Sequence, residues 1–492
     1  MFFGREYELD LLKRLLVKQT ASLVTCQGRR RIGKSTLFER FAELNGCRFL
    51  KIEGLAPRSE GDGQKNEVSD EDQRAAFGRQ LAAQTRLPEI VPTSWTQAFQ
   101  LLDSVITDDR WHVVLLDEIS WMGQRAPDFP GELKVAWDNR FKKHDRLILV
   151  LCGSVSAWIS KNILNNTGFA GRPSVNLYLN ALPLCDCVKF WGDTLARRSS
   201  REILDILSIT GGVPKYLEEI DPSRPVEENV RRLCYSPDGY LYSDFDRIFN
   251  VVFGDRAMRK REILMCLADG PGSVSDISRQ LGKTRNGHLS EDLEELVLAG
   301  FLAADRGLNP QTGKAALSVR YRLQDNYTRF YLKYLLPVKD RIEKRLYDFV
   351  SLERLDNWNA VMGLQFENLI VNNYRMLLPR LGLEHAEILS AEPYRRQSGK
   401  DRAGCQIDLL IQTAGSVYVV EAKRQRKIGQ RAIDELETQI GALGLKKSVS
   451  IRTALVYDGE LESCVFSKRP YDYLIPASEL VFPVNGKESV CV

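Results

Sequence analysis

The chain has 492 residues, too many for a single hydrophobic core, because single domains usually stop growing near about 250–300 residues. Its 43% hydrophobic and 27% charged residues are ordinary for folded globular protein and exclude disordered and fibrous classes. The net charge of +4 comes from 69 basic and 65 acidic residues, so any basic surface must be local. No apolar run approaches the about 20 residues of a membrane span, the N-terminus lacks a signal-peptide pattern, and the ten cysteines are too sparse for a disulfide scaffold. We expect a reduced, cytoplasmic protein with no membrane contact.

A phosphate-binding loop stands near the start of the chain. The apolar run 22–26 predicts a buried strand, and it leads directly into the pattern G-x-x-x-x-G-K-S and then a helical pattern. Glycines let backbone N–H groups surround a phosphate, the helix N-terminus adds partial positive charge, and the lysine neutralises outer phosphates. Ser35 would carry its hydroxyl to Mg²⁺. The residues expected to bind the nucleotide are Gly28, Arg29, Arg30, Arg31, Ile32, Gly33, Lys34, Ser35 and Thr36.

Two carboxylates follow a second buried strand. The run 113–116 ends in Asp117 and Glu118, at the carboxyl end of the strand, where α/β sheets bind ligands. Asp117 is expected to hold Mg²⁺ through water, and Glu118 to orient or deprotonate the attacking water. A third apolar run, 147–152, leads to Ser154, whose hydroxyl either lies beside the same phosphates or merely begins a loop. These patterns predict an α/β nucleotide-binding domain.

Further motifs surround these strands. Residues 2–8, Phe-Phe-Gly-Arg-Glu-Tyr-Glu, resemble the signature that precedes the P-loop in STAND-class ATPases, and the chain is similar to archaeal-type ATPases. Gly171-Arg172, the run from Pro183-Leu184 to Phe190-Trp191, and Gly-Gly-Val-Pro at 211–214 fit that family over residues 1 to about 250. The polar insertion 57–72 departs from it and is expected to be a surface loop.

The resemblance to archaeal-type ATPases implies binding and hydrolysis of ATP with Mg²⁺. It gives Arg5 and Glu6 a supporting role in seating the nucleotide. It also implies that Arg172 senses or stabilises the γ-phosphate, with a solvated surface arginine as the equal alternative.

Residues 255–325 show short helical patterns followed by two strands. Ser273 is expected to cap the second helix, and residues 287–299 are predicted to form the third helix. Residues 301–302 and 319–323 are predicted to form paired strands. This order predicts a winged helix, which often reads DNA through the start of its third helix, near Lys283, Arg285 and His288.

The charge of the predicted winged helix restrains this interpretation. Residues 255–322 carry 11 basic and 9 acidic residues, and four of the acids lie on the third helix. Acids at that helix repel phosphate. Direct DNA reading and an intramolecular lid or protein contact therefore stay open as alternatives.

The last third of the chain carries an acidic constellation. A predicted helix at 363–378 bears Glu367, a strand at 406–411 bears Asp408, and a strand at 417–423 ends in Glu421 and Lys423, with a helix at 432–443 after it. Two residues apart in a strand, Glu421 and Lys423 share a face. Carboxylate oxygens suit Mg²⁺, and a lysine beside them suits an activated water or developing phosphate charge.

This order resembles the PD-(D/E)XK nuclease fold. On that resemblance Asp408 and Glu421 bind metal, Lys423 assists the nucleophile, Glu367 completes the metal shell, and Gln439 matches the helix glutamine of some branches. Ile407 stands where the family pattern has proline.

Basic residues are concentrated around this constellation. Residues 423–431 hold five of them and no acid, and Arg395, Arg396 and Lys400 precede the strands, although residues 351–492 carry 18 basic and 18 acidic residues. The concentration favours a groove that tracks phosphates, with a solvated helix start as the alternative.

The expected fold class is α/β: a P-loop parallel-sheet domain (1–190), a helical lid (191–254), a winged-helix domain (255–325), a helical linker (326–350) and an α/β PD-(D/E)XK nuclease-like domain (351–492). The expected function is a Mg²⁺-dependent ATPase whose nucleotide cycle gates a metal-dependent nuclease on nucleic acid, with DNA favoured. The alternative is a STAND-type signalling switch whose C-terminal domain binds a protein partner without cleaving. Oligomerisation is left open.

Overall fold

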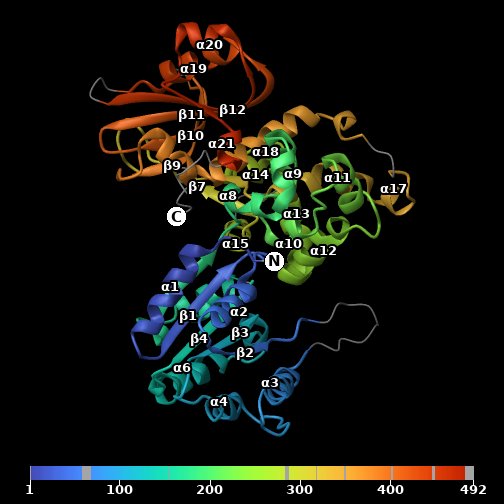
Figure 1. The fold of residues 1–492 in the computed structure, drawn as a ribbon, viewed down its shortest axis with the longest axis vertical. Coiled ribbons are helices and arrows are strands. Elements are labelled where there is room, and N and C mark those ends of the chain that lie inside the picture. Colours follow the sequence, from blue (N-terminus) through green and yellow to red (C-terminus); the bar gives the residue numbers. More distant parts are fainter. Residues whose placement is uncertain are drawn as a thin grey trace. The chain divides into compact units, whose positions relative to one another are not determined.

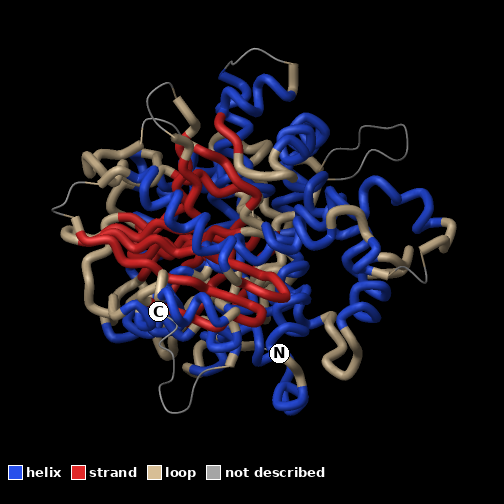
Figure 2. Tube along the Cα trace, turned by 90° about the horizontal axis from the view of Figure 1, so that it is seen from above, coloured by secondary structure: helices blue, strands red, loops and turns tan. Residues whose placement is uncertain are grey.

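The computed structural model describes residues 2–57, 68–154, 156–282, 287–316, 319–347, 351–399, 403–445 and 449–482. The chain forms two compact units, each built from strands and helices (Figures 1 and 2). The first unit comprises Met1–Ala181, Asp246–Ala257 and Glu294–Gly300, and the second comprises Leu182–Phe245, Met258–Leu293 and Phe301–Val492. Among the described residues, no helix is long and apolar enough to span a bilayer.

The first unit is organised around a five-stranded parallel sheet with the strand order β2-β3-β4-β1-β5. Its strands are β1 (Ser22–Gly28), β2 (Arg48–Glu53), β3 (His112–Asp117), β4 (Leu147–Gly153) and β5 (Pro173–Leu179). Every residue of β1, β3 and β4 is buried, as expected for unbroken apolar runs in a parallel sheet covered on both faces. The predicted parallel sheet is therefore confirmed.

Helices cover this sheet (Figure 1). They are α1 (Glu6–Val17), α2 (Lys34–Leu44), α3 (Asp70–Gln84), α4 (Trp95–Asp103), α5 (Ile119–Gly123), α6 (Phe129–Asn139) and α7 (Ser156–Ile159). An apolar core between the sheet and α3, α4 and α6 includes the ring cluster Phe77, Trp95, Phe99 and Phe129.

The edge strand β2 is covered by glutamine side chains of α3. Three glutamines each accept from the backbone N–H and donate to the backbone C=O of one residue, at alternate positions along the chain. The pairs are Gln84 with Lys51, Gln80 with Glu53, and Gln73 with Leu55, at 2.6–2.9 Å. An open edge would otherwise present unpaired backbone groups, so α3 both blocks edge pairing and fixes the position of β2.

Helix α3 also shortens the surface loop expected at 57–72. Ser69 caps the helix in a capping box with Asp72, so the last three residues of the predicted loop are already helical. Residues 58–67 of that prediction lie outside the described residues.

The second unit contains a five-stranded mixed sheet with the order β13-β12-β11-β10-β9. Its strands are β9 (Ser390–Arg396), β10 (Cys405–Gln412), β11 (Ser416–Ile428), β12 (Ser450–Leu461) and β13 (Tyr473–Pro476). Strands β9, β10 and β11 pair antiparallel, whereas β12 and β13 continue parallel to β11. The sheet is packed by α18 (Trp358–Asn372) and α19 (Gln430–Leu443).

Two predicted boundaries in this sheet region were wrong. Strand β11 continues to Ile428, so Glu421 and Lys423 lie in its middle rather than at its end. Helix α18 begins before the predicted start at residue 363, directly after Asn357, which has a left-handed φ of 55°. It ends at Asn372, before the predicted end at residue 378.

Residues 255–325 contain the three helices and the two later strands that were expected, and a short strand, β6, that was not expected lies between the first two helices. They are α13 (Ala257–Cys266), β6 (Gly272–Ser273), α14 (Val274–Gln280), α15 (Gly287–Leu298), β7 (Leu302–Asp305) and β8 (Arg320–Leu323), with sheet order β6-β8-β7. Ser273 caps α14 through a capping box with Asp276, as its position in the sequence predicted.

The second unit contains further helices. They are α8 (Leu184–Cys187), α9 (Ser200–Thr210), α10 (Pro214–Glu218), α11 (Val226–Cys234), the N-terminal part of α12 (Tyr240–Phe253), α16 (Asn326–Phe330), α17 (Lys339–Glu343), α20 (Ser463–Lys468) and α21 (Ser478–Val481).

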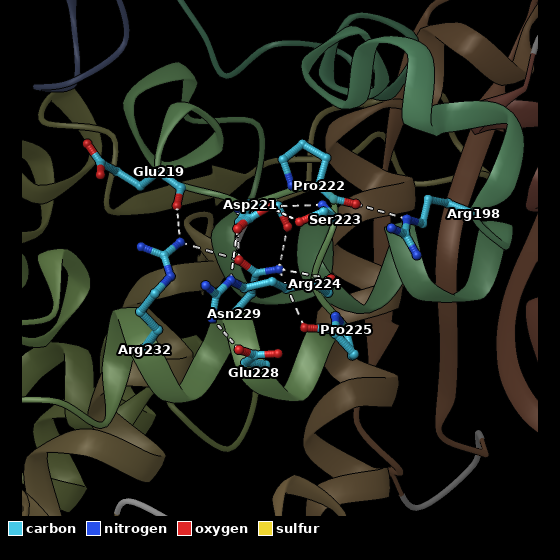
Figure 3. A network of polar contacts seen from close by, with 10 residues as sticks. All are labelled: Arg198, Glu219, Asp221, Pro222, Ser223, Arg224, Pro225, Glu228, Asn229 and Arg232. Carbon is cyan, nitrogen blue, oxygen red and sulfur yellow. Dashed lines mark hydrogen bonds and ion pairs between the residues drawn. The ribbon is translucent and has the colours of Figure 1, made fainter.

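A polar network fixes the loop between α10 and α11 (Figure 3). The buried Asn229 amide donates to the backbone oxygens of Asp221 and Arg224 and accepts from the Asp221 N–H. Arg198 donates to the backbone oxygen of Pro222, and Arg232 to that of Glu219. The network satisfies loop backbone groups and is structural in character.

The cysteines depart in one place from the expectation of a reduced chain. Eight described cysteines are free thiols, whereas Cys185 is disulfide-bonded.

A buried ion pair joins α13 to α15. Lys260 Nζ lies 2.5 Å from Asp292 Oδ1, and the two side chains are 0% and 2% exposed. Arg259 contacts the other carboxylate oxygen at 2.5 Å. Asp292 is therefore an internal residue of the predicted recognition helix and is not available to a ligand.

Replacing Asp292 by alanine should destabilise the protein by about 3 kcal/mol, because two neighbouring cations lose their buried carboxylate. The double variant Lys260→Met, Asp292→Leu should recover part of this loss. Urea unfolding measures both, and Glu291→Ala, an exposed neighbour on the same helix, is the control. Equal losses for Asp292→Ala and Glu291→Ala would contradict the assignment.

Candidate functional site

The P-loop joins β1 to α2, and its lysine is turned onto its own loop. Lys34 Nζ donates to the backbone oxygens of Gly28 and Arg29 at 2.9 and 3.0 Å. Gly28 has φ +140°, and a Cβ added there would stand 2.5 Å from the backbone oxygen of Leu179, so only glycine fits. Gly33, with φ +87°, is also in a conformation that favours glycine.

The other residues of the predicted nucleotide site surround this loop. Arg31 adopts φ 70°, a left-handed conformation that is strained for a residue with a side chain and is typical of functional loops. Ile32 and Arg29 are buried, and Thr36 is exposed on the first turn of α2.

The predicted magnesium ligands lie together. Ser35 Oγ donates to Asp117 Oδ2 at 2.5 Å, across the carboxyl ends of β1 and β3. A hydroxyl and a carboxylate are hard oxygen donors, and their chemistry fits Mg²⁺. Lys51 Nζ also lies 3.2 Å from Asp117 Oδ2 and 3.1 Å from Glu53 Oε2. Burial opposes charging of Lys51, but these two carboxylates raise its pKa.

Glu118, the predicted base, is held from two sides. Its carboxylate accepts from the N–H and hydroxyl of Ser154 at 2.8–3.1 Å, and Arg30 Nε lies 3.6 Å away. Arg30 also covers the ring of Trp121, with its Cζ 5.1 Å from the ring centroid. Ser154 is thus a partner of Glu118, a role that the sequence pattern did not indicate.

Arg5 contacts the P-loop directly. Its guanidinium donates to the backbone oxygens of Ile32 at 3.2 Å and Asn180 at 2.7 Å, and to Glu8 at 3.1 Å. Arg5 therefore ties the chain before α1 to the nucleotide loop, in line with its predicted supporting role.

Arg172 is engaged elsewhere in the first unit. It donates twice to the carboxylate of Asp138 on α6, at 2.8 and 2.9 Å. These bonds from Arg172 hold the pKa of Asp138 well below its usual range. The predicted role of Arg172 at the γ-phosphate would require this pair to open.

The second unit gathers the predicted acidic constellation. Lys423 Nζ lies 3.1 Å from Glu421 Oε2 and 3.1 Å from Glu435 Oε2 of α19. Asp408 Oδ2 accepts from the backbone N–H of Ala422 at 2.9 Å. Glu421 is 4% exposed, and its Oε1 has no hydrogen-bond partner among the described residues. Strands β10 and β11 therefore hold a buried, incompletely satisfied carboxylate beside a lysine.

The charges of these groups shift one another's pKa values, so the groups act as one electrostatic cluster. Burial, and after it the charge of Asp408, raises the pKa of Glu367 and of Glu421 to about 8. Burial also raises the pKa of Asp408. Burial opposes charging of Lys423, but the carboxylates around it raise its pKa above its ordinary value. The cluster thus carries an excess of buried acid over base.

The donor chemistry of this cluster fits a hard divalent cation, and the unsatisfied Glu421 oxygen adds to that fit. The side chains do not, however, converge on one point: among the described residues, no three acidic, histidine or cysteine side chains are placed to hold a metal. Gln439, the predicted helix glutamine, instead accepts from the Gln406 N–H at 2.7 Å.

The basic run after Lys423 is only partly available to phosphate. Arg424 is buried and pairs with Asp205 of α9 and, at 3.3 Å, with Asp458 of β12. Arg426 and Lys427 are exposed on β11. Arg431 pairs with Glu435 at 2.9 Å, and Arg396 donates to the Ala403 oxygen at 3.1 Å. Arg395 is exposed, and Lys400 lies outside the described residues.

The predicted DNA-reading residues give little support to base contacts. Lys283 and Arg285 lie outside the described residues, and His288 is exposed beside Glu291 at 3.6 Å. The segment that follows β7 contacts the mixed sheet: Gln412 donates to the Leu308 oxygen at 2.8 Å, and Gln311 to the Leu443 oxygen at 2.9 Å. These contacts hold the segment after β7 against the mixed sheet of the same unit.

Sequence reasoning missed Lys51, Glu435 and Asp205. Each acts through a partner on another element, and no short motif marks it. The one available signal was the position of Lys51 two residues before Glu53, which puts both on one face of a strand.

The stability of the second unit should fall as pH rises. The folded-state pKa values of Glu367 and Glu421, about 8, lie above the ordinary value of 4.5. Their stabilising contribution is therefore complete below pH 4.5 and is lost as pH rises through about 8. Urea midpoints measured in EDTA should decrease over this range, and less steeply in Glu421→Gln. Glu437→Gln, exposed on α19, should keep the wild-type slope. An unchanged slope in Glu421→Gln would contradict the cluster's role.

Lys34→Ala should lower ATP turnover by at least about 100-fold, because the outer phosphates lose their cation. Phosphate release measures the effect, and Lys18→Ala, an exposed lysine after α1, serves as control. Unchanged turnover in Lys34→Ala would refute the phosphate site.

Comparisons with known proteins bear on the first unit above all. Residues 2–220 match the family described as an ATPase domain predominantly from Archaea. The chain is 22% identical over 368 residues to the uncharacterized protein MJECL04 of Methanocaldococcus jannaschii, covering 75% of this chain and 76% of that protein.

Two solved structures are similar to the chain, at levels that add no functional argument. They are the Walker-type ATPase paby2304 of Pyrococcus abyssi (18% identity, TM-score 0.47, 67% of this chain and 96% of that one) and the Aeropyrum pernix ORC2 protein (14% identity, TM-score 0.41, 70% and 94%). The match of residues 2–220 to this ATPase domain family agrees with the P-loop geometry described above, and the protein is a P-loop ATP hydrolase.

Proposed function

We propose that this ATPase uses its nucleotide cycle, with Mg²⁺ held by Ser35 and Asp117, to control a metal-dependent nuclease-like site on nucleic acid, with DNA favoured. The site comprises Glu367, Asp408, Glu421 and Lys423. The observation that carries the proposal is the buried Glu421 carboxylate, which has one oxygen on Lys423 and the other without a hydrogen-bond partner in the described part of the chain. Burying such a group is costly unless a cation or substrate completes it.

Each residue has a definite part in this proposal. Asp408 and Glu421 would hold the divalent cation, with Glu367 completing its shell, and the bound cation would supply an activated water and neutralise the scissile phosphate. Lys423 would stabilise charge developing on that phosphate. Arg426, Lys427 and Arg395 are exposed and would contact the nucleic-acid backbone.

Two observations favour a second function. Among the described residues the carboxylates do not converge on one point, and Arg424 forms ion pairs with Asp205 and Asp458 of the same unit. Both favour a STAND-type switch in which the mixed sheet binds a protein partner without cleaving. In that case the buried cluster would serve structure or partner contact.

Cleavage of plasmid and single-stranded DNA with Mg²⁺ or Mn²⁺, with and without ATP, separates the two functions. Wild-type protein should cleave, Asp408→Ala should lose at least about 100-fold of that activity, and Asp434→Ala, exposed on α19, should retain it. Lys34→Ala should cleave without responding to ATP. If ATP is hydrolysed while no substrate is cut, the nuclease is refuted and the switch is favoured.

A further inference from the structure

Lys51 brings a cation to the carboxylate that is expected to hold magnesium. Its ammonium nitrogen lies 3.2 Å from Asp117 Oδ2, the same oxygen that accepts from the Ser35 hydroxyl. The Asp117 side chain is 6% exposed and the Lys51 side chain 35%. The ammonium therefore contacts the buried Asp117 carboxylate directly, and it also contacts the half-exposed carboxylate of Glu53 at 3.1 Å.

The backbone beneath Lys51 is fixed. Strand β2 pairs with β3 so that Glu53 lies opposite Asp117, and Lys51, two residues earlier, projects from the same face. The side chain of Gln84 pairs with both backbone groups of Lys51, at 2.9 Å and 2.6 Å. Lys51 thus reaches Asp117 from a strand position that the sheet and α3 hold on both sides.

The P-loop lysine does not perform this task. Lys34 Nζ is bonded to backbone oxygens of its own loop, and the short contacts of Asp117 Oδ2 are with Ser35 and Lys51. A buried carboxylate beside nucleotide phosphates would repel them unless a cation stood between. Lys51 is the side chain placed to supply that charge in the absence of a metal ion.

We propose that Lys51 is a positioning residue that neutralises Asp117 while the magnesium site is empty and gives way when nucleotide brings Mg²⁺. Lys51 thereby sets how strongly nucleotide binding depends on Mg²⁺. This role concerns the ATP hydrolase activity alone and is independent of the proposed nuclease.

The test is equilibrium binding of fluorescent ATP and ADP analogues in Mg²⁺ and in EDTA. The informative quantity is the dissociation constant in EDTA divided by the dissociation constant in Mg²⁺, because a general loss of affinity cancels from this ratio. In Lys51→Gln this ratio should rise at least about fivefold for both nucleotides, since the metal-free complex loses the ammonium that contacts Asp117. Lys51→Arg should keep the wild-type ratio.

Glu53→Gln is the matched control, because it removes the second partner of Lys51 and leaves the contact with Asp117. Its ratio should stay within about twofold of wild type. A wild-type ratio in Lys51→Gln would overturn the proposal. So would a loss confined to the ATP analogue in Mg²⁺, which would place Lys51 on the terminal phosphate. Melting temperatures show whether Lys51→Gln is folded, and Lys51→Met provides the same test if it is not.

Discussion

A carboxylate removed from water requires a cation close by, and this requirement governs both acidic sites of the protein. In the ATPase unit, Lys51 lies on Asp117. In the second unit, Lys423 lies between Glu421 and Glu435. Each lysine occupies part of the volume around oxygen atoms that would otherwise face one another. Each of these ammonium groups contacts two carboxylates, so one cation offsets part of the charge of two acids at each site.

Helix α18 depends on a second kind of constraint, the pairing of buried amides. Gln365 accepts from Arg329 at 2.6 Å and donates to the backbone oxygen of Asn326 at 2.7 Å, and Asn368 donates to the side chain of Asn326 at 2.6 Å. Arg322 of β8 reaches the Asn368 side chain at 2.5 Å. Because buried amides are costly to leave unpaired, they fix the rotation of α18. The same rotation aims Glu367 at the β10–β11 cluster, so that residue is placed by elements distant in sequence.

The sequence predicted features that depend on local physics. Unbroken apolar runs identified three of the five strands of the parallel sheet, β1, β3 and β4, the glycine pattern located the P-loop, and the two-residue spacing put Glu421 and Lys423 on one face. It did not predict that Arg424 is buried, because its partner Asp205 lies more than two hundred residues away along the chain. The extension of β11 to Ile428 was missed for a related reason: exposed basic residues resemble a solvated helix start unless the pairing with β12 is known. Glu435 was not predicted as a site residue, because the sequence of a helix does not indicate which lysine of a strand its side chains will contact.

Helix α15 contributes residues to both compact units. Its residues through Leu293 belong to the second unit, and from Glu294 onward the chain belongs to the first. In the first unit, the Tyr178 hydroxyl donates to the Leu298 oxygen at 3.4 Å, and a Cβ added at Gly300 would stand 3.4 Å from Cβ of the P-loop residue Arg29. In the second unit, Asp292 is held by Lys260. One end of α15 is therefore held by a buried ion pair, and the residues at its other end lie against Tyr178 and Arg29, so packing constrains the helix at both ends.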